Sequence, residues 1–270
     1  MKVIFNADDM GFDPAVNAGI YKAFVSGIVT STSLMANGKA FDKAVDQIQS
    51  AHIPTGIHFN LTTGYPVSPP EQIPSLLQNN GQFWTKWDFA RRLLYSQIDF
   101  YHVRIELYNQ IQKCINAGIF PDHFDGHHHV HLLPPIERII TELVQNSIKK
   151  YRSLSPPAGV SWQLSPLAAF QQFVFNRSSH HRYPGLASPD YFMGMELLTQ
   201  SDKANVLFTL LQHIKPGITE IMCHPGYLLK QPSSIYNRGR EQELKVLTGS
   251  RIKELIRKSD IRLVSFQELG

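Results

Sequence analysis

The chain has 270 residues, of which 43% are hydrophobic, 18% charged and 11% aromatic, with 17 Gly and 17 Pro. This composition excludes disorder, collagen-like repeats and a disulfide-dense scaffold, and a chain of this length can build a core without cross-links. The formal charge of +4, from 26 Lys and Arg against 22 Asp and Glu, is too small to predict a nucleic-acid surface.

The cysteines and the apolar runs bear on the compartment. Only two cysteines occur, Cys114 and Cys223, and they are far apart, so nothing demands a disulfide and a reducing cytoplasm fits. The N-terminal apolar run is too short for a signal peptide, and no stretch approaches the ~18 apolar residues of a membrane span. We therefore expect a cytoplasmic protein without membrane or nucleic-acid partners. The one basic cluster, residues 149–152, is expected to be a solvated helix end.

Patterns typical of strands and helices alternate from the first residues. An apolar run over residues 2–7 ends at Asp8-Asp9. Asp13 is a good N-cap and Pro14 a good first residue for a helix that ends near Gly27. The first half is further expected to contain strands over 28–35 and 55–61, helices near 41–48 and 103–118, and a long Pro/Gly-rich loop over 62–82.

The second half continues the alternation. It predicts a strand over 121–131, helices over 135–149 and 202–214, a strand over 218–224, one helix with its apolar positions at 244–256, and a strand over 261–264. Residues 155–190 are the hardest part to interpret. Repeated alternation of strand and helix implies parallel strands covered by helices, in a barrel or an open sheet. No repeat or linker is evident, so we expect one domain, residues 1–270.

Carboxylates and imidazoles stand at or just after the carboxyl ends of these strands. They are Asp8, Asp9, His58, His127 and His224. Parallel α/β folds form their sites at this edge of the sheet. Adjacent strand residues point to opposite sides, so one carboxylate of the Asp8-Asp9 pair can hold a metal while the other acts as a base.

The run from Asp125 to His131 carries the strongest signal, because four of the twelve histidines fall within it. If the run is extended, one face holds Asp125, His127, His129 and His131, and His128 alone faces the other way. Alternate imidazoles on a strand converge on one ion, and a carboxylate commonly orients such a ligand. The run is internal and flanked by apolar residues, which disfavours an exposed histidine-rich tract.

His224 suits general acid chemistry because histidine titrates near neutrality. Cys223 beside it invites a thiol mechanism, but neighbours on a strand face opposite ways, which disfavours that interpretation. The sequence contains no Gly-x-Ser-x-Gly elbow, phosphate loop or Gly-x-Gly-x-x-Gly fingerprint.

Five motifs occur in a fixed order along the chain. They are Asn6-Ala7-Asp8-Asp9-Met10-Gly11, Thr30-Ser31-Thr32-Ser33 with Asn37-Gly38, Gly56-Ile57-His58-Phe59-Asn60-Leu61, Asp125-Gly126-His127-His128-His129-Val130-His131, and Cys223-His224-Pro225-Gly226. Together they resemble the YdjC-like carbohydrate deacetylases, a family that includes a chitooligosaccharide deacetylase. The resemblance extends from the first strand to residues 262–266.

This resemblance implies an α/β fold of a distorted (β/α)-barrel type, related to polysaccharide deacetylases. It implies one divalent metal ion held by Asp9, His58 and His127, with Asp8 as the catalytic base and His224 as the general acid. The family favours Mg²⁺, whereas two imidazole ligands favour Zn²⁺. Further candidates for contacts to these groups or to the substrate are Asn60, Asp125, His129, His131 and Arg240.

The resulting hypothesis is a hydrolase that removes the N-acetyl group from an N-acetylglucosamine-containing oligosaccharide, such as chitobiose or its phosphate. A metal-activated water would attack the amide and acetate would leave. Two alternatives stay open: a phosphoesterase or amidohydrolase on the same scaffold, and a sugar- or metal-binding protein without turnover. A homodimer fits such a family, although no apolar stripe in the sequence establishes it.

Several side chains are candidates for holding the sugar. The aromatic candidates for stacking are Tyr65, Trp84, Trp87 and Phe192, each of which is otherwise a core residue. The cations that could recognise a phosphate are Arg152, Arg182 and Lys230, each by default a solvated surface side chain.

Overall fold

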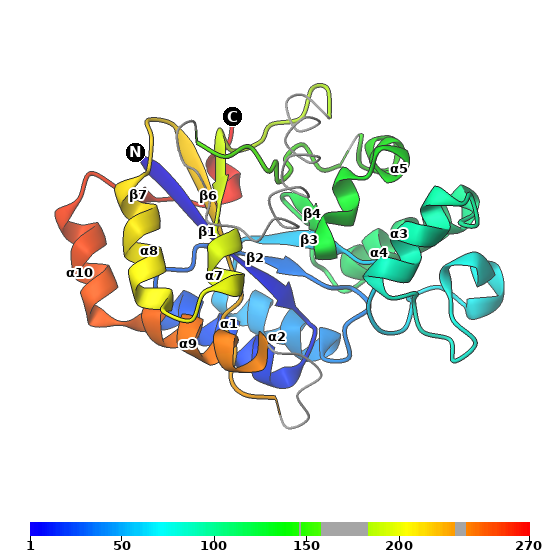
Figure 1. The fold of residues 1–270 in the computed structure, drawn as a ribbon, viewed down its shortest axis with the longest axis horizontal. Coiled ribbons are helices and arrows are strands. Elements are labelled where there is room, and N and C mark those ends of the chain that lie inside the picture. Colours follow the sequence, from blue (N-terminus) through cyan, green and yellow to red (C-terminus); the bar gives the residue numbers. More distant parts are fainter. Residues whose placement is uncertain (146, 158–182, 230–235) are drawn as a thin grey trace.

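A sheet of seven parallel strands forms the centre of the computed structural model, which describes residues 1–145, 147–157, 183–229 and 236–270 (Figure 1). The strands are β1 (Lys2–Met10), β2 (Ser31–Leu34), β3 (Thr55–Phe59), β4 (Phe124–Gly126), β5 (Tyr191–Met193), β6 (Ile218–Cys223) and β7 (Arg262–Leu263). Their order is β4-β3-β2-β1-β6-β5, and β7 pairs with β1. The sheet curls into an open half-barrel, which confirms the expected fold class.

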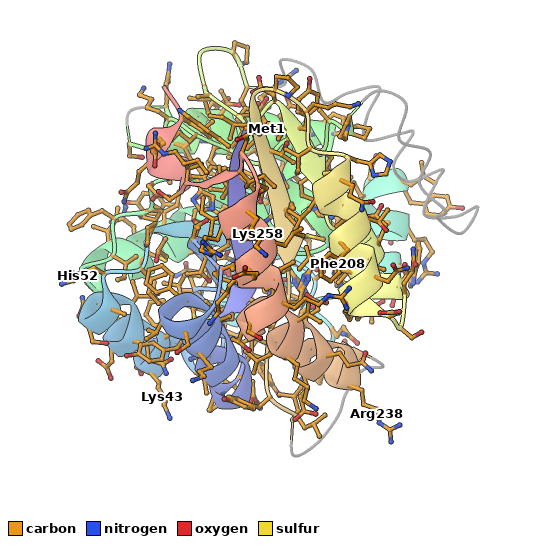
Figure 2. The ribbon with its side chains drawn as sticks, turned by 90° about the vertical axis from the view of Figure 1, so that its left-hand side faces the viewer. Met1, Lys43, His52, Phe208, Arg238 and Lys258 are labelled. Carbon is orange, nitrogen blue, oxygen red and sulfur yellow. The ribbon has the colours of Figure 1, made fainter. Side chains whose placement is uncertain are left out.

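Helices cover the sheet, as the alternating pattern predicts. They are α1 (Pro14–Ser26), α2 (Phe41–Ala51), α3 (Lys86–Leu94), α4 (Phe100–Asn116), α5 (Pro134–Val144), α7 (Met195–Thr199), α8 (Lys203–Gln212), α9 (Tyr236–Thr248) and α10 (Ser250–Lys258). Short 3₁₀ turns are η1 (Pro70–Gln72), η2 (Pro74–Leu76), η3 (His127–Leu132) and η4 (Phe266–Glu268). Figure 2 shows α8, α10, α9, α1 and α2 from the side.

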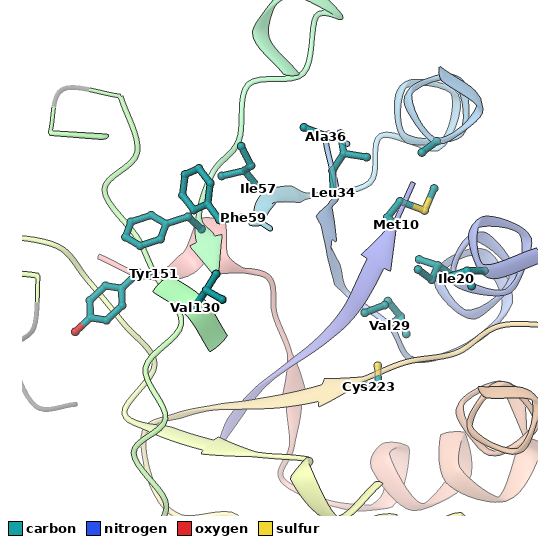
Figure 3. Close-up of a cluster of buried hydrophobic side chains, with 14 of the residues drawn as sticks. Met10, Ile20, Val29, Leu34, Ala36, Ile57, Phe59, Val130, Tyr151 and Cys223 are labelled. Atoms are coloured by element: carbon teal, nitrogen blue, oxygen red, sulfur yellow. The ribbon is translucent and has the colours of Figure 1, made fainter. Parts of the chain in front are cut away.

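The core lies between the strands and these helices. Figure 3 shows part of it, with Met10, Leu34 and Ile57 from neighbouring strands and Ile20 from α1. All four side chains are fully buried. Strand β1 sits inside the sheet, between β2 and β6, so its polar residues must find partners within the protein.

The start of α1 follows the sequence prediction. The Asp13 carboxylate accepts a hydrogen bond from the Ala15 backbone N–H at 2.8 Å, Pro14 is the first helical residue, and Gly27 ends the helix. These contacts satisfy a free N–H of the first turn and fix where β1 gives way to helix.

Several predicted elements have different limits. Strand β4 covers three residues rather than 121–131, because the chain enters η3 directly after Gly126. Helix α5 ends at Val144 instead of residue 149, and the single predicted C-terminal helix is two helices, α9 and α10, separated at Gly249. Strand β5 and helices α3 and α7 were not predicted.

The N-terminus lies beside the segment that leads into β7. The Met1 ammonium donates a hydrogen bond to the Asp260 carbonyl at 3.0 Å, and Lys2 of β1 pairs with Arg262 of β7.

None of the described helices combines the length and the apolar composition that a membrane span requires.

A close approach of α1 to the turn after β6 yields a stability prediction. A Cβ at Gly19 would lie 2.4 Å from the Gly226 Cα, which requires the backbone to move. We expect Gly19→Ala to lower the free energy of unfolding by about 1–3 kcal/mol, measured by urea denaturation. Gly239→Ala on α9 is the matched control, since its Cβ meets only the flexible end of Lys203. There the gain in helix propensity should leave stability unchanged or higher; equal losses in both variants would contradict the packing argument.

Candidate metal and catalytic site

The side chains predicted at the strand ends meet at one edge of the sheet. The strands that carry them are parallel, so their carboxyl ends share that edge. Asp9 Oδ1 lies 3.0 Å from His127 Nδ1 and 3.4 Å from His58 Nε2. His224 Nε2 lies 3.9 Å from Asp8 Oδ2. All five residues to which the resemblance gives a role are therefore close together.

The two adjacent aspartates have different partners. The pairing of β1 with β2 shifts register where they stand, and Asp9 has a φ of 72°. Such irregularities re-aim side chains beside functional sites. Both carboxylates are 2% exposed and line the same cavity, but Asp9 faces imidazoles whereas Asp8 faces the guanidinium of Arg152.

Arg152 is a buried centre of charge, not the surface cation expected from the sequence. Its side chain is inaccessible to solvent and holds both oxygens of Asp8 at 2.6 Å. The same guanidinium contacts Glu220 at 2.7 Å and Asp125 at 2.9 Å. Burying it desolvates the cation, but these three carboxylates outweigh that cost and raise the pKa of Arg152 well above its usual value.

The sequence contained one signal for this buried pairing. Glu220 lies in the middle of the apolar strand β6, where a carboxylate needs a charged or hydrogen-bonding partner. Burial raises the pKa of Glu220 to about 7, although Arg152 opposes this shift. Nothing in the local sequence around residue 152 identifies that partner.

Asp125 links this centre to His58. Its Oδ1 lies 2.6 Å from His58 Nδ1, and its Oδ2 accepts a hydrogen bond from Ser33 at 2.8 Å. Burial by itself lowers the pKa of His58, but Asp125 and the contact with Asp9 outweigh it and raise the pKa to about 10. A carboxylate on Nδ1 leaves Nε2 directed toward Asp9, the arrangement typical of a metal-ligating imidazole.

The charges around Asp9 favour its ionised form. Burial alone raises the pKa of Asp9, but Arg240 and His127 more than offset this and hold the pKa well below the usual value. Arg240 Nη2 contacts Asp9 Oδ2, so the oxygen on the other side, Oδ1, faces His58 and His127. Gly226 leaves room for this arginine: a Cβ at Gly226 would lie 3.2 Å from Arg240 Cδ.

The histidine run is not extended, so the predicted sharing of one face by Asp125, His127, His129 and His131 is wrong. His128 and His129 both adopt left-handed conformations, with φ of 52° and 57°, within η3. The chain therefore turns after His127, and His128 lines the cavity instead of facing away from it. Periodicity cannot reveal such residues, because it assumes a uniform backbone.

The other candidates from this part of the sequence have different positions. His129 lines the cavity and its ring meets Phe192 edge-on. His131 is fully buried, away from the cavity lining, and its Nε2 contacts the Arg152 carbonyl at 3.1 Å. Asn60 ties the turn after β3 together, donating to Asn37 and to the Thr63 carbonyl.

His224 is held by its own backbone rather than by a carboxylate on its ring. Its N–H donates to Glu243 Oε2 at 2.6 Å, while its Nδ1 is buried and has no hydrogen-bond partner among the described residues. Burial lowers the pKa of His224 to about 4, against the opposing effect of Asp8 and Asp9. Cys223 is fully buried with its Sγ on the Asn6 carbonyl, and burial raises its pKa well above the usual value, so it is no nucleophile.

A cavity of about 610 Å³ opens over these groups. Trp87 and Phe192, two of the four predicted stacking residues, line it. The other two do not: Tyr65 is 58% exposed elsewhere, and Trp84 packs under Arg92 at 3.6 Å. The predicted cations Arg182 and Lys230 lie outside the described residues.

The side chains suit a divalent cation at one position. Ligand atoms of Asp9, His58 and His127 lie within 4.8 Å of one another, and within the described part of the chain the buried Asp9 Oδ1 has no hydrogen bond of regular geometry. One carboxylate and two imidazoles are a common ligand set that leaves coordination positions open. The ligand atoms of a second group, Asp8, His58 and Asp125, also lie within 4.8 Å of one another, but both of its carboxylates are already paired with Arg152.

Comparison with known proteins identifies relatives along the whole chain. The model of the YdjC-like protein family matches residues 2–258. A carbohydrate deacetylase of Brevibacillus brevis is 34% identical and one of Clostridium beijerinckii 30% identical, and each alignment covers 100% of both chains. A human carbohydrate deacetylase is 31% identical over all of this chain and 91% of its own.

Solved structures agree on the fold. A protein of Enterococcus faecalis, described as a putative cellobiose-phosphate cleavage protein, superimposes with a TM-score of 0.78 at 26% identity, covering 98% of this chain and 97% of that one. A lactam utilization protein of Thermus thermophilus superimposes with a TM-score of 0.54 at 13% identity, over 98% of this chain and 100% of its own, which indicates a shared fold alone.

Removal of the buried guanidinium should be costly. Arg152→Met leaves three carboxylates buried around an uncharged side chain, so we expect the free energy of unfolding to fall by about 3–5 kcal/mol in urea denaturation at pH 7. Arg257→Met is the matched control, because Arg257 pairs with Glu254 at the surface and its loss should hardly change stability. Similar losses in both variants would show that Arg152 does not offset the cost of burying these carboxylates.

Glu220 should make stability depend on pH. Its folded pKa is raised from 4.5 to about 7, so its contribution is fully present below pH 4.5 and is lost as the pH rises through 7. Glu220→Gln removes this dependence. The stability of the wild type relative to Glu220→Gln should therefore fall by roughly 2–3 kcal/mol between pH 5 and pH 8 in urea denaturation. A difference that stays constant or grows with pH would show that Glu220 is ionised throughout.

Proposed function

The chain belongs to the YdjC-like family, and from this premise we propose that it hydrolyses the N-acetyl amide of an amino-sugar oligosaccharide with a divalent metal ion held by Asp9, His58 and His127. One observation carries the proposal: a buried carboxylate oxygen faces two imidazoles at a cavity, with a second, separately held carboxylate, Asp8, beside them. The relatives named carbohydrate deacetylase support the reaction class.

The metal contributes charge that the protein alone lacks. When bound, a divalent ion acidifies water and polarises the amide carbonyl. Two imidazoles and one carboxylate suit Zn²⁺, whereas the resemblance to the family favours Mg²⁺, so both ions belong in the test. Asp125 holds His58 from behind and Arg240 holds Asp9, which keeps both side chains oriented for a cation.

Asp8 and His224 are the proposed pair for proton transfer. Asp8 is close enough to the ligand group to take a proton from an attacking water, while Arg152 fixes the orientation of its carboxylate. His224 Nε2 lies 3.9 Å from Asp8 Oδ2, so a proton taken up by Asp8 has a short path to the imidazole. Burial lowers the pKa of His224 to about 4, so the imidazole is neutral near pH 7 and would act as the acid by passing to the departing amine the proton that Asp8 takes up.

A small oligosaccharide fits the remaining surface. Trp87 is 54% exposed at the cavity and offers an apolar face of the kind on which sugar rings stack. The description of the Enterococcus protein that superimposes on this chain names a disaccharide phosphate, cellobiose phosphate. We therefore propose chitobiose, free or phosphorylated, as the first substrates to examine.

Acetate release tests this function. The metal-loaded wild type should release acetate from N,N′-diacetylchitobiose or its 6-phosphate, and removal of the metal should abolish release until Mg²⁺ or Zn²⁺ is restored. Asp8→Asn should lower the rate by about 10²–10⁴-fold, because the base is lost. Acetate is measured by a coupled assay, and thermal unfolding checks that the variant is folded.

Asp46→Asn is the matched control, because Asp46 is an exposed carboxylate on α2 that does not line the cavity. It should retain the wild-type rate. Acetate release without any metal, or full activity of Asp8→Asn, would refute the proposed chemistry. Hydrolysis of a phosphate ester or another amide without acetate would leave the metal site in place but change the substrate class.

A further inference from the structure

Left-handed backbone conformations gather at the cavity. In the described residues, five residues other than glycine have positive φ. His52 and Ser96 follow the ends of α2 and α3, where such conformations are ordinary. The other three, Asp9, His128 and His129, all line the cavity. Left-handed conformations cost free energy in a residue with a side chain and persist where the surroundings impose them, most often at functional sites.

His128 is the member of this group with an exposed side chain. Its Nδ1 lies 2.9 Å from the Thr62 hydroxyl, and its ring centroid is 4.1 Å from that of His127. It belongs to neither compact group of metal-ligating side chains. An exposed ring adds little to the core, so glycine would serve the backbone better at this position. The imidazole itself therefore needs an explanation.

The contact with Thr62 determines what the ring offers to the cavity. The Thr62 hydroxyl has two acceptors within reach, His128 Nδ1 at 2.9 Å and Asn60 Oδ1 at 3.4 Å. Asn60 Oδ1 already accepts the Thr62 backbone N–H at 3.0 Å. We assign the hydroxyl proton to the nearer acceptor, Nδ1, and with this assignment the hydrogen of a neutral ring is on Nε2. His128 then presents an N–H donor held by a hydrogen bond from behind.

We propose that His128 binds the substrate, with Nε2–H donating a hydrogen bond to a hydroxyl oxygen of the sugar whose acyl group lies at the ligand group of Asp9. This inference deepens the proposed function and rests on it. Two observations point to a sugar. The ring stands directly beside His127, next to the proposed reaction centre. Trp87, which is 54% exposed, lines the same cavity and offers aromatic surface against which a sugar ring can pack.

Substitutions separate the ring from the backbone strain. His128→Gly removes both, His128→Ala removes the ring but keeps a Cβ, and His128→Asn keeps a donor on a residue that tolerates the left-handed region. Each is made in the Asp8→Asn background so that bound sugar is not turned over. Binding of N,N′-diacetylchitobiose to the metal-loaded protein is measured by calorimetry, with thermal unfolding and metal titration alongside.

We expect His128→Gly and His128→Ala to weaken sugar binding about 5- to 10-fold and His128→Asn to lie in between. His128→Gly should melt about 2–4 °C above His128→Ala, because it relieves the strain. Metal affinity should stay unchanged in all three. His52→Gly is the matched control: His52 has the same φ of 52° at the exposed end of α2 (Figure 2), so it should melt higher with no change in sugar binding.

Each other outcome decides against part of this account. Unchanged sugar affinity in His128→Gly would overturn the assignment. A lower metal affinity or a lower melting temperature of His128→Gly would also overturn it, because the ring would then have a structural role. A wild-type protein that binds the disaccharide through His128 but releases no acetate would refute the proposed function and leave this inference standing. Acetate release by His128→Gly with an unchanged KM would support the proposed function and refute the role of His128.

Discussion

The reactive edge of this protein depends on one buried guanidinium. Arg152 contacts Asp8 on β1, Asp125 on β4 and Glu220 on β6, three buried carboxyl groups that would be costly to hold together without a cation. These ion pairs connect β1, β4 and β6 to the segment that carries Arg152, and β4 and β6 lie on opposite sides of β1 in the sheet. Arg152 also fixes the directions of Asp8 and, through Asp125, of His58. Arg152 therefore holds in place both the proposed base, Asp8, and, through Asp125, one of the candidate metal ligands, His58.

This arrangement of contacts explains how two adjacent carboxylates acquire different chemistry. Asp8 is held by Arg152 through both oxygens, which fixes its orientation and leaves only its remaining lone pairs for the proposed proton transfer. Asp9 is turned by its left-handed backbone toward the imidazoles, and Arg240 occupies its second oxygen. The separation follows from the irregularity in β1, since a regular strand would send one of the two side chains to the other face of the sheet.

Local rules account for what could be predicted from the sequence. Asp13 and Pro14 located the start of α1, and the parallel sheet brought Asp9, His58 and His127 together, because strand ends obey simple geometry. The failures have a different cause. Arg152 was missed because its partners come from three distant strands. The shared face of the histidine run failed because two consecutive left-handed residues leave no periodic trace. Strand β5, three residues long, is too short to show a pattern.

These failures concern the residues that distinguish this site from a generic one at a sheet edge. A parallel sheet supplies ligand positions readily, since its strand ends converge whatever the loops contain. The convergence of strand ends does not by itself pair buried charges or produce left-handed turns. Both persist only because contacts from the rest of the fold impose them. In this chain the left-handed conformations are those of Asp9, His128 and His129, all at the cavity. The buried cation Arg152 contacts Asp8, the residue before Asp9. These left-handed conformations lower the stability of the fold, but they hold the side chains at the cavity in fixed positions. Fixed positions are what substrate binding and catalysis require.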